Sequence, residues 1–380
     1  MITNQRAQFN LPDDVRYLNC AYMGPWTKQA SEIIQEQTLV RQRPYLFTTP
    51  DFFDPVDQLK KSFASLIGVD DHLRIAPLTS VSYGMAQAMT NVKLNKGQKI
   101  IMIEDEFPSD VYAVKAAVER SGAELKVIKR PSPIDTWSEN VLNAIDDSVG
   151  LVVMSQVHWA DGYLFDLKSI TTKIHHHGGL IVLDGTQSIG AFPFSIKEIP
   201  VDALITATYK WLLGPYGFSL GYFGEAFDGG KPIEDSWMNR IESDVFYKLT
   251  DYKSQYRPAA WRYSAGEQSN MLAIKLADAS LQYIQSLTPG GIQEYTQSIT
   301  AKSFGKLKEN GFSVYDEQYR AQHLFGIHCP PNLNQQVLLK NLEEEKIFVS
   351  RRGEYIRVSP NVYNSAEEMD LLTDVLIRSL

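Results

Sequence analysis

A lysine and an aspartate that each follow an apolar run are the residues best placed to do chemistry in this chain of 380 residues. Asp184 comes directly after Leu180-Ile-Val-Leu, and Lys210 comes after Ala203-Leu-Ile-Thr-Ala-Thr-Tyr and before Trp211. Apolar surroundings disfavour an ammonium ion, so the pKa of Lys210 should fall, and a neutral amine is a nucleophile that can form a Schiff base. A carboxylate on the neighbouring strand could hold a protonated pyridine nitrogen. Together the two groups predict a site for pyridoxal 5′-phosphate (PLP).

Each of these residues also has an ordinary structural interpretation. Lys210 could pack its stem on Trp211 with its charge in water, and Asp184 could cap the turn that follows its strand. Their occurrence on consecutive strands favours function. Lys210 would then hold PLP and move the Cα proton, and Asp184 would pair with the pyridinium nitrogen in a bond of about 1.5–3 kcal/mol. Gln187 could contact the ring 3′-oxygen or be a surface amide.

Hydroxyl and aromatic side chains could complete such a site. Val81 and Ser82 lie in Thr-Ser-Val-Ser-Tyr-Gly, which opens a helix and offers hydroxyl and N–H groups to a phosphate, although it could equally be an ordinary helix cap. Thr208 and Tyr209 directly precede the lysine and could add phosphate contacts. Phe107 could stack on the pyridine ring or be a core residue.

Two further patterns bear on ligands. Arg357 lies in Tyr-Ile-Arg-Val-Ser-Pro, where it could clamp a substrate α-carboxylate or be a surface arginine on a strand. Three consecutive histidines, at 175–177, do not predict a metal site, because neighbouring residues on a helix point about a hundred degrees apart. The chain has no GxGxxG, Walker A or HExxH motif, so nucleotide and zinc sites are not expected.

The composition is that of an ordinary globular protein, with 44% hydrophobic and 22% charged residues. Its formal net charge of −8 makes a nucleic-acid partner unlikely on electrostatic grounds, because a polyanion would be repelled. The 2 cysteines, Cys20 and Cys329, give no disulfide framework. The first ten residues are polar, and no apolar run is long enough to span a membrane. We therefore expect a cytoplasmic protein.

Two regions differ in their pattern of apolar residues. From about residue 56 to 223, short apolar runs alternate with helical ones, which predicts a mostly parallel sheet with helices on both faces. Ligands collect at the carboxyl ends of such strands. Later helical patterns and short strands predict a smaller α+β domain. The expected division is 1–20 as an N-terminal segment packing with the small domain, 21–258 as the large domain and 259–380 as the small domain.

The predicted elements of the first region are strands at 99–103, 125–128, 151–154, 180–183, 203–206 and 219–223, with helices at about 56–67, 82–93, 109–121, 138–146 and 167–177. In the second region we expect helices at about 267–287, 291–310 and 365–379, and strands near 324–328, 347–350 and 354–358.

On these residues the chain resembles the class V aminotransferase family of fold type I PLP-dependent enzymes. The resemblance rests on the Asp184…Gln187…Lys210 core, on Tyr17-Leu-Asn-Cys-Ala-Tyr-Met-Gly near the start and on Arg357-Val-Ser-Pro-Asn-Val-Tyr-Asn-Ser-Ala-Glu-Glu near the end. It implies a large domain with a seven-stranded type of sheet, and a homodimer whose active sites are shared between subunits. The site residues it implies are Lys210 as catalytic residue, Val81, Ser82, Phe107, Asp110, Ser155, Asp184, Gln187, Thr208, Tyr209 and Trp237 at the cofactor, and Arg357 at the substrate.

The motifs also bear on the branch of that family. Phe107-Pro-Ser-Asp and Thr208-Tyr-Lys resemble kynureninase and the isopenicillin-N-epimerase-like relatives. Cysteine desulfurases have a histidine at the stacking position and a catalytic cysteine before the arginine strand, and 349–355 contains no cysteine. Glu267 stands where the family has a threonine that contacts the neighbouring phosphate, which is unfavourable for an anion.

The resemblance thus implies a PLP-dependent enzyme that acts on an α-amino acid, with transamination as the first expectation. A kynureninase-like carbon–carbon lyase and an amino-acid racemase or epimerase begin with the same deprotonation at Cα and stay open as alternatives. A binding protein that kept the fold and lost catalysis is an alternative of another class.

Overall fold

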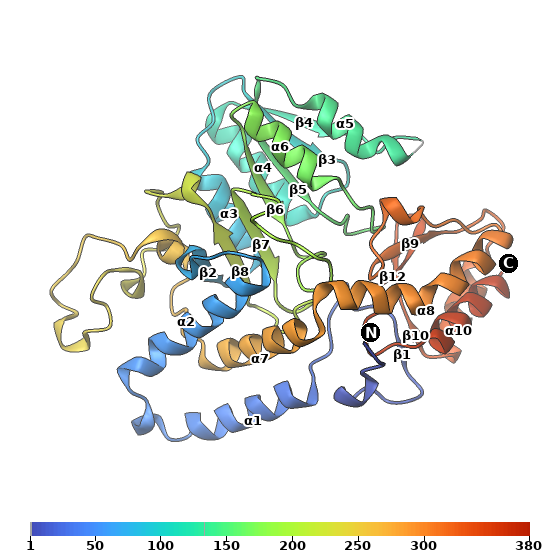
Figure 1. Cartoon of the computed structure of the whole chain (residues 1–380), viewed down its shortest axis with the longest axis horizontal. Helices are drawn as coiled ribbons and strands as arrows, with labels where there is room; N and C mark the ends of the chain where they lie inside the picture. Colours follow the sequence, from blue (N-terminus) through green and yellow to red (C-terminus); the bar gives the residue numbers. More distant parts are fainter. Residues whose placement is uncertain (1, 133) are drawn as a thin grey trace.

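The computed structural model describes residues 2–132 and 134–380, and its larger unit is built on a mixed seven-stranded sheet (Figure 1). The strand order is β2-β8-β7-β6-β5-β3-β4, and β8 runs antiparallel to its two neighbours while the other pairings are parallel. The strands are β2 (Ile75–Leu78), β3 (Lys99–Ile103), β4 (Glu124–Ile128), β5 (Val149–Ser155), β6 (Leu180–Asp184), β7 (Ala203–Ala207) and β8 (Ser219–Phe223). The mostly parallel sheet predicted from the sequence is confirmed.

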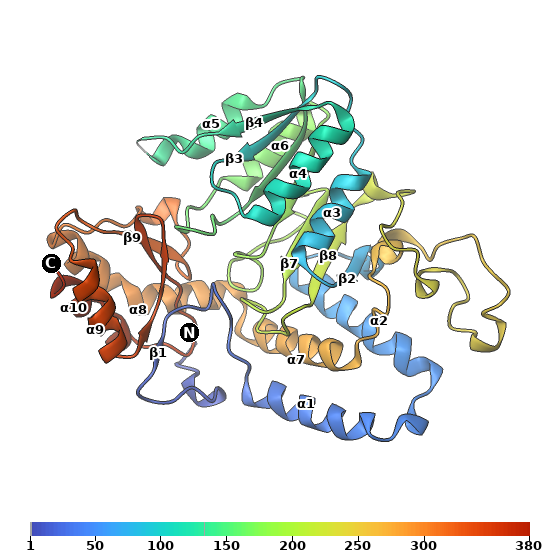
Figure 2. The same ribbon diagram turned by 180° about the vertical axis from the view of Figure 1, so that it is seen from behind.

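The central strands are apolar along their whole length because helices cover both faces of the sheet. On β5, alternate side chains belong to different cores: Val152 and Met154 face one, and Leu151 and Val153 face the other. Figures 1 and 2 show the helices on the two sides. The first core is covered by α2 (Thr49–Leu66), α5 (Trp137–Ala144), α6 (Leu167–His176) and α7 (Met271–Leu287), and the second by α3 (Val81–Asn91) and α4 (Pro108–Ser121).

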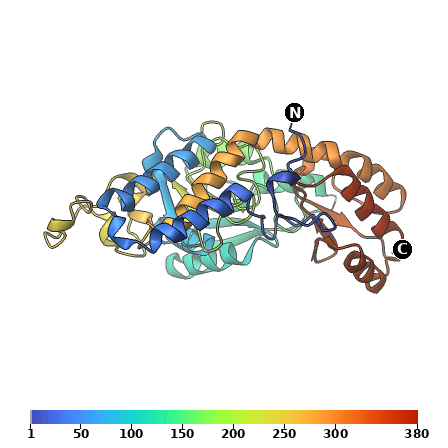
Figure 3. The same ribbon diagram turned by 90° about the horizontal axis from the view of Figure 1, so that it is seen from below.

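A smaller unit has its own sheet and its own core. Its antiparallel strands lie in the order β11 (Ser350–Arg352), β12 (Tyr355–Val358) and β9 (Phe325–His328). The helices α8 (Pro289–Glu309), α9 (Gln335–Glu344) and α10 (Ala366–Ile377) accompany this sheet. Figure 3 shows the orange helices α7 and α8 following one another from the large unit to the small one. Within residues 2–132 and 134–380, no helix is both long and apolar enough to cross a membrane.

Two packing features bear on the expected domain division. The strand β1 (Arg16–Tyr17) pairs in parallel with β10 (Ile347–Phe348), so the N-terminal segment lies against the small unit. Helix α7, which the sequence pattern assigns to the small domain, packs along α1 (Lys28–Arg41) and α2 instead. Its residues Ala273 and Ile274 belong to the core of the large sheet.

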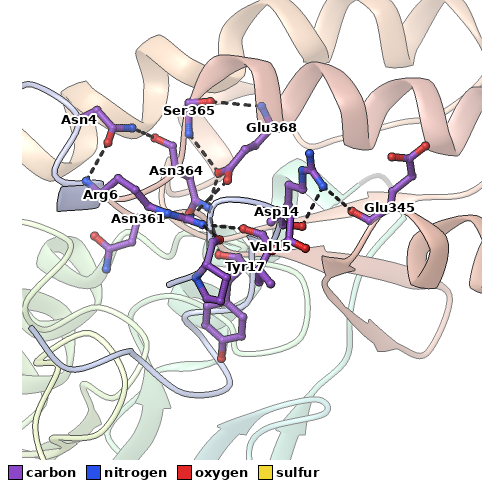
Figure 4. A network of polar contacts seen from close by, with 12 residues as sticks. Asn4, Arg6, Asp14, Val15, Tyr17, Glu345, Asn361, Asn364, Ser365 and Glu368 are labelled. Carbon is purple, nitrogen blue, oxygen red and sulfur yellow. Dashed lines mark hydrogen bonds and ion pairs between the residues drawn. The ribbon is translucent and has the colours of Figure 1, made fainter. Parts of the chain in front are cut away.

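A network of polar contacts around Asn364 ties the N-terminal segment to α10 (Figure 4). The fully buried amide of Asn364 donates to the carbonyl oxygen of Tyr17 at 3.1 Å and to Glu368 at 2.8 Å, and its oxygen accepts from the N–H of Asn361 at 2.9 Å. Ser365 caps α10 and exchanges hydrogen bonds with Glu368 in a capping box. The side chain of Asn364 thus forms hydrogen bonds with the N-terminal segment, with the turn before α10 and with α10 itself.

Replacing Asn364 with alanine should lower the free energy of unfolding by about 3 kcal/mol, because it leaves a buried N–H and a buried carbonyl without partners. Ser365→Ala is the matched control, since it removes only a helix cap worth about 1 kcal/mol. The midpoint of thermal unfolding should therefore fall further for Asn364→Ala than for Ser365→Ala. Equal midpoints for the two variants would contradict the role given to Asn364.

Candidate active site

A cavity of about 270 Å³ opens at the carboxyl ends of β5, β6 and β7, and most of the predicted site residues line it. This is the edge at which parallel strands present ligand-binding groups. The predicted residues on its wall are Val81, Ser82, Phe107, Ser155, Asp184, Gln187, Tyr209 and Lys210. Residues from four separate strand ends are thus brought to one place.

Lys210 follows β7 and is only 7% exposed. Its Nζ lies 5.5 Å from the ring centroid of Phe107 and 5.6 Å from that of Tyr209, and it forms no hydrogen bond with the described part of the chain. Burial lowers the pKa of Lys210 to about 8, against the opposing charge of Asp184 and with the help of two nearby arginines, Arg357 and Arg352. A substantial share of the amine is therefore neutral near physiological pH, which makes it a nucleophile and a base.

Asp184 is the last residue of β6 and lies directly across from Ser155 on β5. Its Oδ1 accepts a hydrogen bond from the N–H of Thr186 at 2.8 Å, so the structural interpretation of this aspartate, a cap for the next turn, also holds. The carboxylate nevertheless lines the cavity in which the Lys210 amine lies. One side chain therefore shapes the turn and places a negative charge at the cavity wall.

Asp110 lies behind Asp184 and not on the cavity wall, although the sequence analysis places it at the cofactor. It is fully buried in the first turn of α4, and no donor in the described part of the chain reaches either of its oxygens. Burial, and then the charge of Asp184, raise the pKa of Asp110 well above its usual range. The raised pKa favours the neutral form of Asp110 next to Asp184.

Glu106 is a cavity residue that the sequence analysis missed. Its carboxylate accepts from the N–H and Oγ of Ser155, at 2.9 and 3.0 Å, and from the N–H of Phe107 at 2.9 Å. Burial raises the pKa of Glu106, against the lowering effect of His158. These bonds hold Phe107 and Ser155 in place, and they occupy the hydroxyl proton of Ser155. The sequence feature that could have identified Glu106 is its position directly before Phe107, a predicted site residue.

The N-terminus of α3 forms one end of the cavity. Ser80 is the helix cap, with its Oγ accepting from the N–H of Tyr83 at 3.0 Å, so the first N–H groups of the helix, at Val81 and Ser82, have no intrahelical acceptor. The Oγ atoms of Ser82 and Ser109 lie 2.8 Å apart on the same side. Free N–H groups, hydroxyls and the positive end of the helix dipole together suit a phosphate.

The side chains of Thr208 and Gln187, which are near Lys210 and Asp184 in the sequence, form hydrogen bonds with other residues of the chain. The Oγ1 of Thr208 lies 2.7 Å from the carbonyl oxygen of Pro215 and 2.9 Å from that of Phe218, so this hydroxyl fastens a loop and does not line the cavity. The side chain of Gln187 does line it. Its oxygen accepts from the indole of Trp211 at 2.8 Å, which links the glutamine to the residue after the lysine.

Arg357 lies on β12 and is 2% exposed. Its Nη1 donates to the carbonyl oxygen of Trp159, a cavity residue, at 2.9 Å. Its Nε and Nη2 are buried and find no acceptor in the described part of the chain. Burial and the charge of Arg352 lower the pKa of Arg357 to about 9. A buried guanidinium with two unused donors fits a carboxylate, which accepts from both in parallel.

Trp237 and Glu267 line a second cavity, of about 800 Å³, and not the first. The two cavities share Thr79, Gly217 and Phe218 in their walls. Trp237 is 43% exposed, and it reaches no residue of the first cavity's lining through any contact described. Within a single chain it therefore lies apart from Lys210.

Comparisons with known proteins agree on one family. The family model "Aminotransferase class-V" matches residues 48–372. An uncharacterized aminotransferase, YcbU of Bacillus subtilis, is 26% identical over 312 residues, covering 82% of this chain and 80% of that protein. A kynureninase of Cryptococcus neoformans is 26% identical over 359 residues, covering 85% of this chain and 78% of that protein. The solved structure of a C-DES mutant with glycine covalently linked to the PLP cofactor superimposes with a TM-score of 0.85 at 20% identity, covering 100% of both chains.

Proposed function

Because this chain belongs to the class V aminotransferase family, we propose that it is an aminotransferase that acts on an α-amino acid. It is a PLP-dependent enzyme. The observation that carries the proposal is the buried Lys210 amine, with a pKa lowered to about 8, in the same cavity as the carboxylate of Asp184. The relative named as an uncharacterized aminotransferase agrees with this reaction, and the relative named as a kynureninase keeps the carbon–carbon lyase as the second candidate.

The residues around the cavity fit the chemical groups of the cofactor. The free N–H groups and Ser82 hydroxyl at the start of α3 would hold the phosphate, and Phe107 would cover the ring. Asp184 would hold the protonated ring nitrogen, and Asp110, whose neutral form is favoured by its raised pKa, lies next to it. When bound, the cofactor supplies an electron sink for the negative charge that develops at the substrate Cα.

Lys210 performs the proton transfers in this proposal. Its neutral Nζ would take the proton from the substrate Cα, and the ammonium ion that results would deliver a proton to the carbon on the other side of the amino nitrogen, two bonds from Cα. Arg357 holds the α-carboxylate through the Nε and Nη2 donors that no other group uses. The aromatic residues Phe107, Trp159 and Tyr209 on the cavity wall exclude water from the base.

The lowered pKa of Lys210 predicts how covalent uptake of PLP by the apo-protein depends on pH. The neutral fraction of an amine with a pKa of about 8 rises about tenfold between about pH 6 and pH 7 and levels off above the pKa. The initial rate of the absorbance change, corrected for the separately measured titration of free PLP, should follow this curve and level off above about pH 8. A rate that continues to rise tenfold per pH unit up to about pH 10 would indicate an ordinary lysine.

A desulfurase reaction is not proposed, because neither cysteine offers a thiolate. Burial raises the pKa of Cys20 and of Cys329 to about 11. Cys20 lies in the core against the carbonyl of Lys210, and Cys329 lies in the small unit. Sulfur transfer through a persulfide requires a nucleophilic thiolate that can reach the substrate. The hairpin of β11 and β12 has no such residue.

The experiment that tests transamination follows both partners of the reaction. The holoenzyme is mixed with one amino acid and one α-keto acid, and all four compounds are quantified. We expect the first amino acid to become its α-keto acid in a one-to-one ratio with amination of the acceptor. Cleavage of the carbon skeleton would instead select a lyase, and loss of optical activity without a keto acid would select a racemase.

We also propose a homodimer in which the second cavity meets the partner subunit. Residues between β8 and α7, yellow in Figure 1, extend away from the sheet, and Tyr247 and Tyr252 there are 85% and 87% exposed. Large exposed aromatic residues are typical of interfaces. Trp237 and Glu267, on the wall of the second cavity, would then lie between the subunits. The exposed carboxylate of Glu267 would face away from a phosphate, since the two anions repel each other.

A further inference from the structure

A second arginine, Arg352, lies on the same face of the small sheet as Arg357. In the antiparallel pairing of β11 with β12, Ser350 is opposite Arg357 and Arg352 is opposite Tyr355. Residues opposite each other, and residues two apart on a strand, share a face of the sheet. Arg351 is therefore on the other face, where it is exposed and hydrogen-bonds to Gln335.

Both arginines contact Trp159, a residue of the first cavity. The guanidinium carbon of Arg352 lies 5.7 Å from the ring centroid of Trp159, and Arg357 donates to the carbonyl oxygen of the same residue at 2.9 Å. Trp159 also stacks edge-on against Phe107, with 5.6 Å between the ring centroids. The two guanidinium groups therefore lie against Trp159, a residue of the cavity wall, although neither arginine itself is among the lining residues.

Neither arginine has a carboxylate partner within the described residues. Arg352 donates through Nη1 to the carbonyl oxygen of Arg351, and its buried Nε has no acceptor. In contrast, the neighbouring Arg130 is neutralised by Asp161 and also bonds to Tyr315. The chain has 45 acidic and 37 basic residues, so the absence of an acidic partner here is not explained by a shortage of carboxylates.

Two neighbouring cations without anionic partners repel each other, and this repulsion lowers pKa values in the site. The charge of Arg352 lowers the pKa of Arg357 and also that of Lys210. An arrangement of this kind is stabilised when anionic groups bind between the cations. The α-carboxylate of a substrate would bind Arg357 and would leave Arg352 without an anionic partner.

We propose that Arg352 binds a second anionic group, on the side chain of the substrate, so that the enzyme acts on amino acids with an acidic side chain. This inference rests on the proposed function. Arg357 holds the α-carboxylate, and Arg352, on the same face of the hairpin, holds the side-chain carboxylate. The planar guanidinium gives a two-point contact with each carboxylate.

The test uses simple carboxylic acids as probes, because they bind without reacting. Succinate, glutarate and butyrate are titrated into the holoenzyme by calorimetry. We expect the better of the two dicarboxylates to bind on the order of 10- to 100-fold more tightly than butyrate, the factor that a charge-assisted pair supplies. Equal affinities of the wild-type enzyme for all three acids would overturn the proposal without any variant.

Arg352→Gln should remove the preference for the dicarboxylate, because the affinity for that acid should fall far more than the affinity for butyrate. Arg351→Gln, the adjacent residue on the opposite face, is the matched control and should keep the preference. The absorbance of bound PLP reports whether each variant is folded, and Arg352→Lys, which keeps the charge, should retain part of the preference. Equal losses in Arg352→Gln and Arg351→Gln would contradict a specific contact.

Turnover separates this inference from the function on which it rests. With aspartate or glutamate, Arg352→Gln should lower kcat/KM on the order of 10- to 100-fold more than it does with alanine. An enzyme that transaminates alanine but shows no preference for acidic amino acids would refute the role of Arg352 alone. An enzyme that transaminates no amino acid would refute the proposed function.

Discussion

Replacing Lys210 with alanine should lower kcat by about 10⁴-fold or more, with PLP still bound by the other groups of the cavity. The reason is that Lys210 alone, among the described residues of the cavity wall, carries an amine, and we propose that this amine serves as both covalent anchor and base. The measurement is single-turnover conversion of the amino acid at saturating concentration. Added methylamine should restore part of the rate, because a small amine can replace the missing base.

Lys60 provides the control for this substitution. It is also a fully buried lysine, and burial lowers its pKa well below the usual value. Its Nζ lies 3.4 Å from the ring centroid of Trp261, and it lines neither of the two cavities. Lys60→Met should therefore keep its turnover. A large loss in Lys60→Met together with near-normal turnover in Lys210→Ala would contradict the account.

Replacing Asp184 with asparagine should lower kcat/KM on the order of 100-fold, the loss expected when a charge-assisted bond to the ring nitrogen is removed. Asparagine keeps an oxygen that can accept from the N–H of Thr186, so the turn is retained and only the charge is lost. The measurement is kcat/KM with the best amino acid, together with the dissociation constant of PLP.

Asp110→Asn is the matched control, because the raised pKa of Asp110 favours its neutral form and asparagine is a neutral side chain of the same shape. We expect its kcat/KM to fall by less than about tenfold. If Asp110→Asn were as damaging as Asp184→Asn, the negative charge that acts on the ring would be on Asp110. If neither variant lost activity, no carboxylate would be needed there.

The large sheet could be predicted from the sequence because its strands are buried on both faces and read as uninterrupted apolar runs. The predicted strands at 99–103 and 219–223 coincide with β3 and β8. Helix α1 escaped prediction because only Ala30 of its 14 residues is buried, so it has no apolar stripe. Strand β2 escaped because it has 4 residues and contains Pro77, which an edge strand tolerates.

The site residues that directly follow parallel strands could be predicted from the sequence. The carboxyl ends of parallel strands lie at the same edge of the sheet, so these residues must come close together. Thr208 does not line the cavity, because its hydroxyl donates to the carbonyl oxygens of Pro215 and Phe218 in a neighbouring loop, and its neighbour Lys210 gives no sign of this. The hydrogen bonds of Glu106 to Ser155 and the ring contact of Arg352 join residues that lie far apart in the sequence. Arg352 reaches Trp159 from a hairpin in another unit, and no spacing in the sequence predicts that contact.

The most direct test of the central claim is to reduce the holoenzyme with borohydride and to locate the modified lysine by mass spectrometry of its peptides. Borohydride fixes PLP to the amine that holds it. The account predicts one phosphopyridoxyl group per chain, on Lys210, with Lys60 unmodified. Modification of Lys60 or of an exposed lysine in place of Lys210, or no modification of a PLP-saturated protein, would contradict it.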